Sequence, residues 1–429
     1  MWKEEYKRKR VTADEAVMHI RHGDKVMAGD LVNSAKELLD AMARNKEHFR
    51  DVSIYQMDPK DEVKYAQPGM EPYFRAATTF AGKQTRDAVN GGTGDFIPCF
   101  FHMIPEIIRT EIKPDVALVL VSPPDKDGYC SYGTMASNLP AAVETARLVI
   151  AEVNDRMPYT FGTYLHISEI DYLVEVSRPI FEVPPPAIGE VEQAIGEICA
   201  SLIEDGATIQ VGIGAVPEAT LHMLKGKRDL GVHTELLGDG IIDLIEAGVI
   251  TNKKKTFNPG KCIATIYNGT QKLYDYVDHN PRFELRPVDY TNDVRIICQH
   301  DNLVSINACL QVDLLGQVNS ETIGGKQFSG IGGQVDFVRG ASMSRGGKSI
   351  LAFSSTTAGG KISKIVSFLE RGSVVTTSRT DVDYAVTEYG YAKLRGKSIR
   401  ERAKALIAIA HPKFQAQLSE EFEKAFFKL

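Results

Sequence analysis

The sequence lacks the signals of several protein classes. None of its six cysteines is spaced as a C-x-x-C pair or a zinc-ligand set, so we predict buried thiols in a reducing compartment instead of a zinc site or a disulfide framework. No apolar run reaches the roughly 18 residues that span a bilayer, and residues 1–6 contain no apolar signal region. We therefore expect a cytoplasmic protein that does not associate with membranes.

Positive charge is not in excess either. The formal net charge is −6, and lysine and arginine are spread along the chain. Nucleic-acid binding surfaces concentrate positive charge, so we expect no nucleic-acid partner. The apolar fraction of 43% and the charged fraction of 25% are ordinary for a soluble globular protein. An anionic ligand would have to be held by local donors, because the overall charge does not attract it.

Several catalytic motifs are also missing. The chain has no H-E-x-x-H, and no G-x-S-x-G precedes a helix. The segment 345–349 resembles the end of a P-loop, but Ser342 stands where the first glycine is required. These absences argue against a zinc protease, an α/β-hydrolase and a P-loop nucleotidase.

Strand-like and helix-like patterns alternate along the chain, which is typical of βαβ units with largely parallel sheets. A chain of 429 residues suggests two or three domains. Residues 59–95 are rich in Pro, Gly and polar residues, so we expect long loops there. We predict strands over 24–28, 52–55, 116–122, 148–153, 373–377 and 384–387, and helices over 12–17, 34–43, 403–408 and 419–427.

A proline-rich segment and a repeated pattern divide the chain. Residues 181–187 contain three consecutive prolines, which neither a sheet ladder nor a helix interior tolerates. We therefore predict domains at 1–183 and 184–429. The strand-to-helix pattern at 23–29 recurs at 206–212. The sequence thus predicts two similar open α/β domains from a tandem duplication, with the active site at the domain interface.

The most informative stretch is 207–240. Thr208–Val211 reads as a buried strand, and a glycine loop follows it at Gly212–Val216. Pro217 suits the first position of a helix, where its missing N–H would be unpaired anyway. A strand, a glycine loop and a helix in this order direct backbone N–H groups and the positive helix end toward one point. The geometry suits a phosphate or another anion, although glycine turns without a ligand also precede helices.

A second strand is predicted at 231–234, and Glu235 follows its carboxyl end, where ligands bind in open α/β sheets. The alternative is a solvated glutamate at a strand end. His233 is a candidate base if the strand continues regularly. A second glycine loop lies within 328–337 and contains Gly330, Gly332 and Gly333. Its free N–H groups suit an oxyanion or a cofactor, and the alternative is a solvent-exposed glycine hairpin.

Nearly the whole chain resembles the acetyl-CoA hydrolase/transferase family of class I CoA-transferases, and within it the 4-hydroxybutyrate CoA-transferases and their butyryl-CoA:acetate relatives. The resemblance depends on five motifs, which are Gln210–Pro217, His233–Glu235, Phe328–Ala341, Val386–Gly390 and Ile409–Pro412. It implies that Glu235 is the nucleophile. The segments expected to contact coenzyme A contain Gly212, Ile213, Gly214, Ala215, Val216, Gly330, Gly332 and Gly333.

The resemblance also implies the chemistry. Glu235 would attack an acyl-CoA and pass through a glutamyl-CoA thioester, with ping-pong kinetics. The implied substrates are an acyl-CoA (acetyl-CoA or butyryl-CoA) and a small carboxylic acid such as 4-hydroxybutyrate, butyrate, acetate or itaconate. The resemblance implies no permanently bound cofactor. It also implies that the protein is a homodimer or a higher homo-oligomer. Two positions depart from the family pattern, at 33–35 and at Lys361, so the acid and a contact between Lys361 and coenzyme A stay open. An acyl-CoA hydrolase and a non-catalytic sensor that binds coenzyme A are the alternatives.

Overall fold

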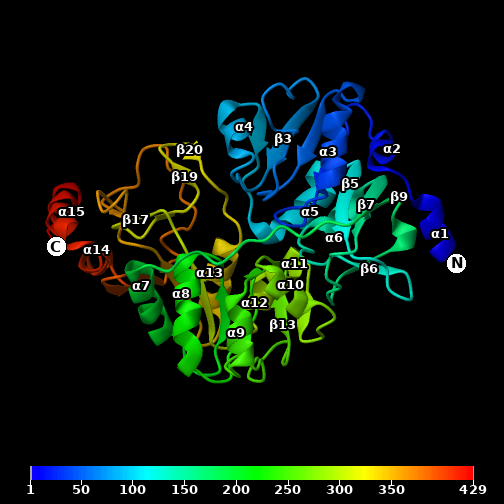
Figure 1. Ribbon diagram of the computed structural model, residues 1–429. Helices are drawn as coiled ribbons and strands as arrows, with labels where there is room; N and C mark the ends of the chain where they lie inside the picture. Colours follow the sequence, from blue (N-terminus) through cyan, green and yellow to red (C-terminus); the bar gives the residue numbers. More distant parts are fainter. Residues whose placement is uncertain (1, 429) are drawn as a thin grey trace. The chain divides into compact units, whose positions relative to one another are not determined.

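The computed structural model describes residues 2–428 (Figure 1). The chain forms two compact units, and neither is one continuous segment. Unit 1 contains residues 1–184, 263–291 and 327–332, and unit 2 contains residues 185–262, 292–326 and 333–429. The first boundary between the units lies in the proline-rich segment. The predicted division into two continuous domains at 183/184 stays a prediction.

Unit 1 is built on a seven-stranded sheet in the order β4-β3-β2-β1-β5-β7-β9. All neighbouring strands in this sheet are parallel. The strands are β1 (Lys25–Ala28), β2 (Val52–Tyr55), β3 (Phe74–Thr78), β4 (Gly94–Phe96), β5 (Val116–Val121), β7 (Leu148–Asn154) and β9 (Tyr172–Val176). The hairpin strands β6 (Tyr129–Ser131) and β8 (Tyr164–His166) pair separately. The helices are α1 (Trp2–Lys9), α2 (Ala13–Val17), α3 (Lys36–Arg44), α4 (Arg86–Gly91), α5 (Ile104–Ile107), α6 (Leu139–Thr145), α10 (Gln271–Val277) and α11 (Val288–Thr291).

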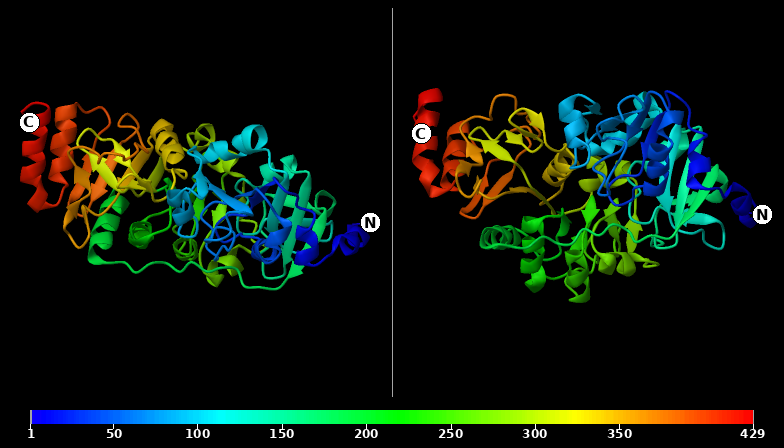
Figure 2. Two further views of the ribbon diagram at one scale, coloured as in Figure 1. Left: turned by 90° about the horizontal axis from the view of Figure 1, so that it is seen from above. Right: turned by 45° about the horizontal axis from the view of Figure 1, so that its top comes forward.

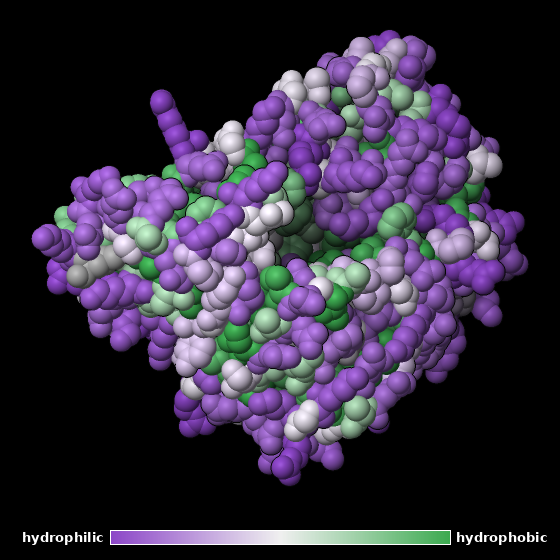
Figure 3. Space-filling model, turned by 60° about the vertical axis from the view of Figure 1, so that its left-hand side comes forward, coloured by the Kyte–Doolittle hydropathy of each residue, from purple (hydrophilic) through white to green (hydrophobic). Residues whose placement is uncertain are grey.

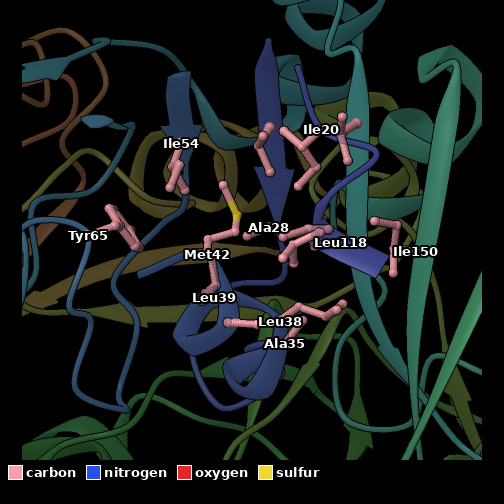
Figure 4. Packing of buried hydrophobic residues seen from close by; sticks show 14 of the residues in the cluster. Ile20, Ala28, Ala35, Leu38, Leu39, Met42, Ile54, Tyr65, Leu118 and Ile150 are labelled. Atoms are coloured by element: carbon pink, nitrogen blue, oxygen red, sulfur yellow. The ribbon is translucent and has the colours of Figure 1, made fainter. Parts of the chain in front are cut away.

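The core of unit 1 forms where helix α3 covers the sheet. Leu38, Leu39 and Met42 repeat at helical spacing, so they share one face of α3. Figure 4 shows that this face points toward the sheet, where side chains such as Ile54 and Leu118 are fully buried. The predicted helix over 34–43 is confirmed within two residues. Thr12 caps α2 through a complete capping box with Glu15, as expected for its sequence.

The prediction of long loops over residues 59–95 is confirmed for residues 59–73, which contain no helix or strand, and is wrong from residue 74 onward. This stretch contains β3, α4 and the start of β4. Strand β3 is short, and the turn residues around it hide its pattern. Its register is nevertheless regular, with Val52 opposite Phe74 and Tyr55 opposite Ala77. Tertiary pairing with β2 therefore decides the structure where local sequence signals are weak.

Unit 2 has a six-stranded sheet in the order β11-β10-β16-β21-β25-β26. Its strand pairs are parallel except β25 with β26. The strands are β10 (Thr208–Val211), β11 (Gly231–Val232), β16 (Leu303–Asn307), β21 (Lys348–Ala352), β25 (Tyr384–Thr387) and β26 (Gly390–Lys393). The helices are α7 (Glu190–Ser201), α8 (Ala215–Met223), α9 (Gly240–Glu246), α12 (Val294–Ile297), α13 (Gln334–Met343), α14 (Ile399–Ala408) and α15 (Pro412–Ala425).

Shorter strands complete the chain. They are β12 (Leu236–Leu237), β13 (Cys262–Ala264), β14 (Ile266–Tyr267), β15 (Phe283–Leu285), β17 (Gln311–Asp313), β18 (Val318–Asn319), β19 (Thr322–Ile323), β20 (Lys326–Gln327), β22 (Thr356–Thr357), β23 (Ile362–Ser363) and β24 (Ile365–Val366).

The two large sheets repeat one plan, as the sequence predicts. The order β2-β1-β5-β7-β9 in unit 1 recurs as β11-β10-β16-β21-β25 in unit 2. Strand β1 pairs with β5 as β10 pairs with β16, both in parallel. The predicted fold class, two similar open α/β domains with largely parallel sheets, is confirmed.

Two details of unit 2 differ from the predictions. Residues 373–377 form no strand, and Thr377 makes only an isolated bridge to Val318. Helix α15 begins at Pro412, seven residues before the predicted start, because Pro412 occupies its first turn and His411 caps it. Figures 1 and 2 show α15 beside α14. Helix α14 starts with a complete capping box between Ser398 and Glu401.

None of the six cysteines forms a disulfide in the described chain. Among residues 2–428, no helix combines the length and the apolar character that a membrane crossing requires. The face of the molecule shown in Figure 3 is mostly hydrophilic, with smaller apolar areas between the polar residues.

Candidate active site

Two predicted segments of unit 2 leave the same edge of its sheet. Strands β10 and β11 are adjacent and parallel, with Ile209 opposite Val232. The loop that starts at Gly212 and the segment that carries Glu235 therefore both follow the carboxyl ends of neighbouring strands. The Thr234 hydroxyl donates to the Val211 carbonyl over 3.3 Å and fastens the second segment to the end of β10. This edge is where open α/β sheets bind ligands.

The glycine loop ends as the N-cap of helix α8. Gly214 has φ +131° and ψ 171°, a conformation that only glycine adopts readily. The helix starts at Ala215, so Pro217 occupies its third position and not the predicted first one. The N–H groups of the first turn have no intrahelical acceptors and can meet an anion. The predicted contacts of Gly212–Val216 with coenzyme A stay a prediction.

The Glu235 carboxylate is held by donors from two other segments of unit 2. The Asn292 side-chain amide donates to Glu235 Oε2 over 2.7 Å, and the Gly333 backbone N–H donates to the same carboxylate. Asn292 is fully buried and also donates to Asp336 Oδ2 over 3.4 Å. One amide therefore bridges two carboxylates, which fixes the position of Glu235.

Gly333 lies so close to the carboxylate that no side chain fits there. A Cβ atom on Gly333 would lie 1.8 Å from Glu235 Oε2 and 2.3 Å from Asn292 Nδ2. Its φ of −89° is ordinary for any residue, so the requirement for glycine is spatial and not conformational. Glycine at this position lets the backbone donate directly to the carboxylate.

Burial raises the pKa of Glu235 to about 8, because its ionised form loses water contacts. The nearby Asp336 carboxylate raises this pKa further, whereas the hydrogen bonds from Asn292 and Gly333 lower it. The residue as a whole keeps partial solvent exposure. A desolvated carboxylate with fixed donors beside it has the properties of a nucleophile in covalent catalysis.

Helix α13 is anchored so that Gly333, its N-cap, stays in place. The Gln334 side chain donates to the Ala308 carbonyl over 2.5 Å. Its Oε1 accepts from the hydroxyls of Ser320, at 2.8 Å, and Thr377, at 2.9 Å. Three separate loops of unit 2 therefore hold the start of the helix.

The second glycine loop does not form a solvent-exposed hairpin, because residues 334–343 form helix α13. Only Gly333 of this loop belongs to unit 2 with Glu235. Gly330 and Gly332 belong to unit 1, where the Ser329 carbonyl accepts from the Ala81 N–H over 3.2 Å. The predicted roles of Gly330 and Gly332 stay predictions. Lys361 is exposed, and its contact with coenzyme A stays open.

Sequence reasoning missed Asn292 and Asp336. Asn292 follows a four-residue helix with no distinctive pattern, so only the fold brings it to Glu235. Asp336 lies in the first turn of α13, three residues after Gly333, a position that favours an acidic residue in any helix. His233 is fully buried, with its ring centroid 4.5 Å from that of His300. It packs in the core of unit 2, which argues against the candidate role of a base.

Comparison with known proteins gives the family of the chain. The family models of the acetyl-CoA hydrolase/transferase N-terminal and C-terminal domains match residues 1–183 and 269–422. A 4-hydroxybutyrate coenzyme A transferase of Clostridium kluyveri is 52% identical over 99% of this chain and 100% of its own length. A butyryl-CoA:acetate CoA-transferase of Anaerostipes caccae is 39% identical over 99% and 98% of the two chains.

A solved structure extends the similarity to three dimensions. The 4-hydroxybutyrate CoA-transferase of Porphyromonas gingivalis superposes with a TM-score of 0.87 and 40% sequence identity, over 99% of this chain and 100% of that one. With both domain models matched and full-length relatives well above 30% identity, the chain belongs to the acetyl-CoA hydrolase/transferase family and is a coenzyme A transferase.

Proposed function

We propose that the enzyme moves coenzyme A between acetyl-CoA or butyryl-CoA and a short-chain carboxylic acid, with 4-hydroxybutyrate or butyrate as the acceptor. The coenzyme A thioester is a substrate, and no cofactor is permanently bound. The observation that carries the proposal is the Glu235 carboxylate, fixed by the Asn292 amide and the Gly333 N–H. The names and identities of the relatives support the choice of acids.

The reaction begins when a Glu235 carboxylate oxygen attacks the thioester carbonyl carbon. The C–S bond breaks, which releases the coenzyme A thiolate and leaves an acyl-glutamyl anhydride. The thiolate then attacks the Glu235 carbonyl carbon, and the first carboxylate leaves. The resulting glutamyl-CoA thioester repeats these steps in reverse with the incoming acid. One thioester replaces another, and covalent catalysis divides the exchange into easier steps.

The donors around Glu235 serve each tetrahedral stage. The Asn292 amide and the Gly333 N–H are placed to stabilise negative charge that develops on the glutamyl oxygen. A well-placed donor of this kind contributes roughly 3–4 kcal/mol to transition-state stability. The loop Gly212–Val216 and the N-terminus of α8 would bind an anionic part of coenzyme A. Binding energy from these remote parts would orient the reacting atoms.

The chemistry is tested by trapping the intermediate. Acyl-CoA alone, followed by borohydride, should reduce Glu235 to an alcohol that mass spectrometry locates on its peptide. Glu235→Gln should abolish both trapping and acyl exchange. The matched control is Glu204→Gln, because Glu204 is an exposed glutamate of the same unit that forms a surface ion pair with Lys348. Trapping at another residue, or full exchange by Glu235→Gln, would contradict the proposal.

The substrate is tested with a panel of acids against acetyl-CoA, read by mass spectrometry of the thioesters formed. We expect the largest kcat/KM for 4-hydroxybutyrate or butyrate. Release of free coenzyme A without any acid, as fast as exchange, would instead identify a hydrolase. Tight binding of coenzyme A without turnover across the panel would identify a sensor.

A further inference from the structure

Gly333 has no side chain with which to hold its own position. A Cβ atom there would lie 1.8 Å from Glu235 Oε2, so only glycine fits. Its backbone N–H must nevertheless stay on the Glu235 carboxylate, to which it donates. The next residue, Gln334, is buried, and both the nitrogen and the oxygen of its side-chain amide make hydrogen bonds. The task of fixing the Gly333 N–H therefore falls to Gln334.

The orientation of the Gln334 amide follows from its three partners. The amide nitrogen faces the Ala308 carbonyl, which can only accept. The amide oxygen faces the hydroxyls of Ser320 and Thr377, which can donate. Rotation of the amide by a half-turn would bring its oxygen against the Ala308 carbonyl oxygen. One arrangement therefore satisfies all three partners, and a fully satisfied buried network of this kind rigidifies the structure around it.

The two hydroxyl partners of Gln334 are themselves fixed to each other. The Thr376 hydroxyl oxygen accepts from the Ser320 N–H over 2.9 Å. The N–H groups of Thr376 and Thr377 both donate to the Val318 carbonyl, over 2.8 Å and 3.2 Å. Both threonines are buried. Instead of a strand, the end of the segment 373–377 thus forms a junction that joins the loop of Ser320 to Gln334.

We propose that Gln334 is a positioning residue for the transfer reaction, which holds the Gly333 N–H against the Glu235 carboxylate. Ser320 and Thr377 act through Gln334, because their hydroxyls donate to its amide oxygen. The effect on Glu235 passes through the backbone of Gly333, the neighbour of Gln334 in the chain. This inference rests on the proposed function, because it takes Glu235 as the nucleophile.

The first test is Gln334→Met, which removes all three hydrogen bonds and keeps a side chain of similar length. A displacement of about 1 Å at a reacting group costs roughly 100-fold in rate, so partial loosening should lower kcat about 10-fold in the exchange of labelled acetate into acetyl-CoA. The Gly333 N–H lowers the pKa of Glu235. Its loss should therefore raise the midpoint of the pH profile of kcat/KM by about 0.5–1 pH unit. Asp336, the neighbouring carboxylate that also shifts this pKa, is unchanged in the variant.

The matched control lies at the other end of the same helix. Ser344 is the C-cap of α13, and it is as buried as Gln334, both being 7% exposed. Its hydroxyl donates to the His300 carbonyl over 2.6 Å and accepts from the Leu303 N–H over 3.2 Å. Ser344→Ala should lower Tm but leave kcat and the midpoint unchanged. Equal losses of exchange in Gln334→Met and Ser344→Ala would show that activity follows the stability of α13 and would overturn the proposal.

A double-mutant cycle tests whether Thr377 acts through Gln334. Thr377→Val removes one hydroxyl and keeps the shape of the side chain, so it should lower kcat about 3-fold, as expected for one neutral hydrogen bond. The double variant should then lose no more than Gln334→Met alone, because the two residues share one interaction. Additive losses would overturn the action of Thr377 through Gln334. If Gln334→Met does not fold in thermal melting, Thr377→Val decides, and an unchanged kcat and midpoint would overturn the proposal.

Glu235→Gln separates a failure of this inference from a failure of the proposed function. If Glu235→Gln keeps full exchange, Glu235 is not the nucleophile, and the proposed function and this inference both fail. If Glu235→Gln abolishes exchange while Gln334→Met keeps the rate and the pH midpoint of the unmodified enzyme, only this inference is overturned. A lower kcat with a raised midpoint in Gln334→Met, and neither change in Ser344→Ala, supports it.

Discussion

Replacement of Gly333 by alanine gives the sharpest test of the site, because one methyl group meets both the nucleophile Glu235 and its hydrogen-bond donor Asn292. The new Cβ would lie 1.8 Å from Glu235 Oε2, whereas real Cβ contacts essentially never fall below 3.0 Å. The carboxylate must therefore move by at least 1.2 Å, the difference between these two distances. Asn292 Nδ2, at 2.3 Å, must also move, so the 2.7 Å hydrogen bond between them cannot keep its geometry.

A misplacement of about 1 Å at a reacting group costs roughly 100-fold in rate. We therefore expect Gly333→Ala to lower kcat by about 100-fold or more. The fold should survive, because φ −89° suits alanine and overpacking of this kind costs about 1–3 kcal/mol. The assay is the exchange of isotopically labelled acetate into acetyl-CoA, which needs no knowledge of the physiological acid. Thermal melting reports the stability of the same samples.

The control is Gly226→Ala in the same unit, since a Cβ on Gly226 would meet no atom within 4 Å. It should keep the exchange rate of the unmodified enzyme. Exchange by Gly333→Ala within threefold of that rate would refute the argument that close contact with Gly333 positions Glu235. Loss of exchange together with a collapsed melting transition would show a folding defect, and Gly333→Ser would then repeat the comparison.

Three further predictions concern the contacts of Glu235, and a fourth concerns a buried ion pair of unit 1. Asn292→Ala removes a hydrogen bond to a charged group worth about 1.5–3 kcal/mol, so kcat/KM should fall about 10- to 100-fold in the acetate-exchange assay. The attacking carboxylate must be ionised, so kcat/KM for acyl-CoA should rise with pH and level off above about 8, the pKa of Glu235. Asp336→Asn removes a negative charge beside Glu235, so it should move the midpoint of this pH profile to lower pH. The pKa of Glu235 is raised in the folded state, so its contribution to the free energy of unfolding is present at low pH and lost as pH rises through about 8. Glu235→Gln should therefore raise Tm more at pH 9 than at pH 5.5. An equal change in Tm at both pH values would contradict the raised pKa. Arg178→Met leaves Glu152 buried without its cation, 3.4 Å away, and should lower the free energy of unfolding by about 3 kcal/mol in urea denaturation.

The sequence predicts the fold well where patterns are long and local. The runs at 116–122 and 148–153 are apolar apart from Ser122 and Glu152, and both form the buried strands that such runs indicate. The capping residues Thr12 and Ser398 mark helix starts for a local electrostatic reason. Strand β3 escapes prediction because its five residues form a strand only through pairing with β2 and β4.

The candidate site is only partly readable from sequence. Glu235 and the loop Gly212–Val216 follow strand signals, so their common edge of the sheet can be predicted. Asn292 carries no signal, because a single buried amide looks the same in any loop. The close contact between Gly333 and Glu235 depends on how α13 is anchored by Gln334, a relation between loops far apart in the sequence that no local pattern encodes.

The division of the chain into units has a consequence for its synthesis. The polypeptide passes from one unit to the other five times, at 184/185, 262/263, 291/292, 326/327 and 332/333. Unit 1 therefore lacks part of its chain until residue 332 has left the ribosome, by which point about three-quarters of the protein has been made. Neither unit can be obtained intact as a single uninterrupted fragment, so a truncation at the proline-rich segment would produce two incomplete folds rather than two working halves.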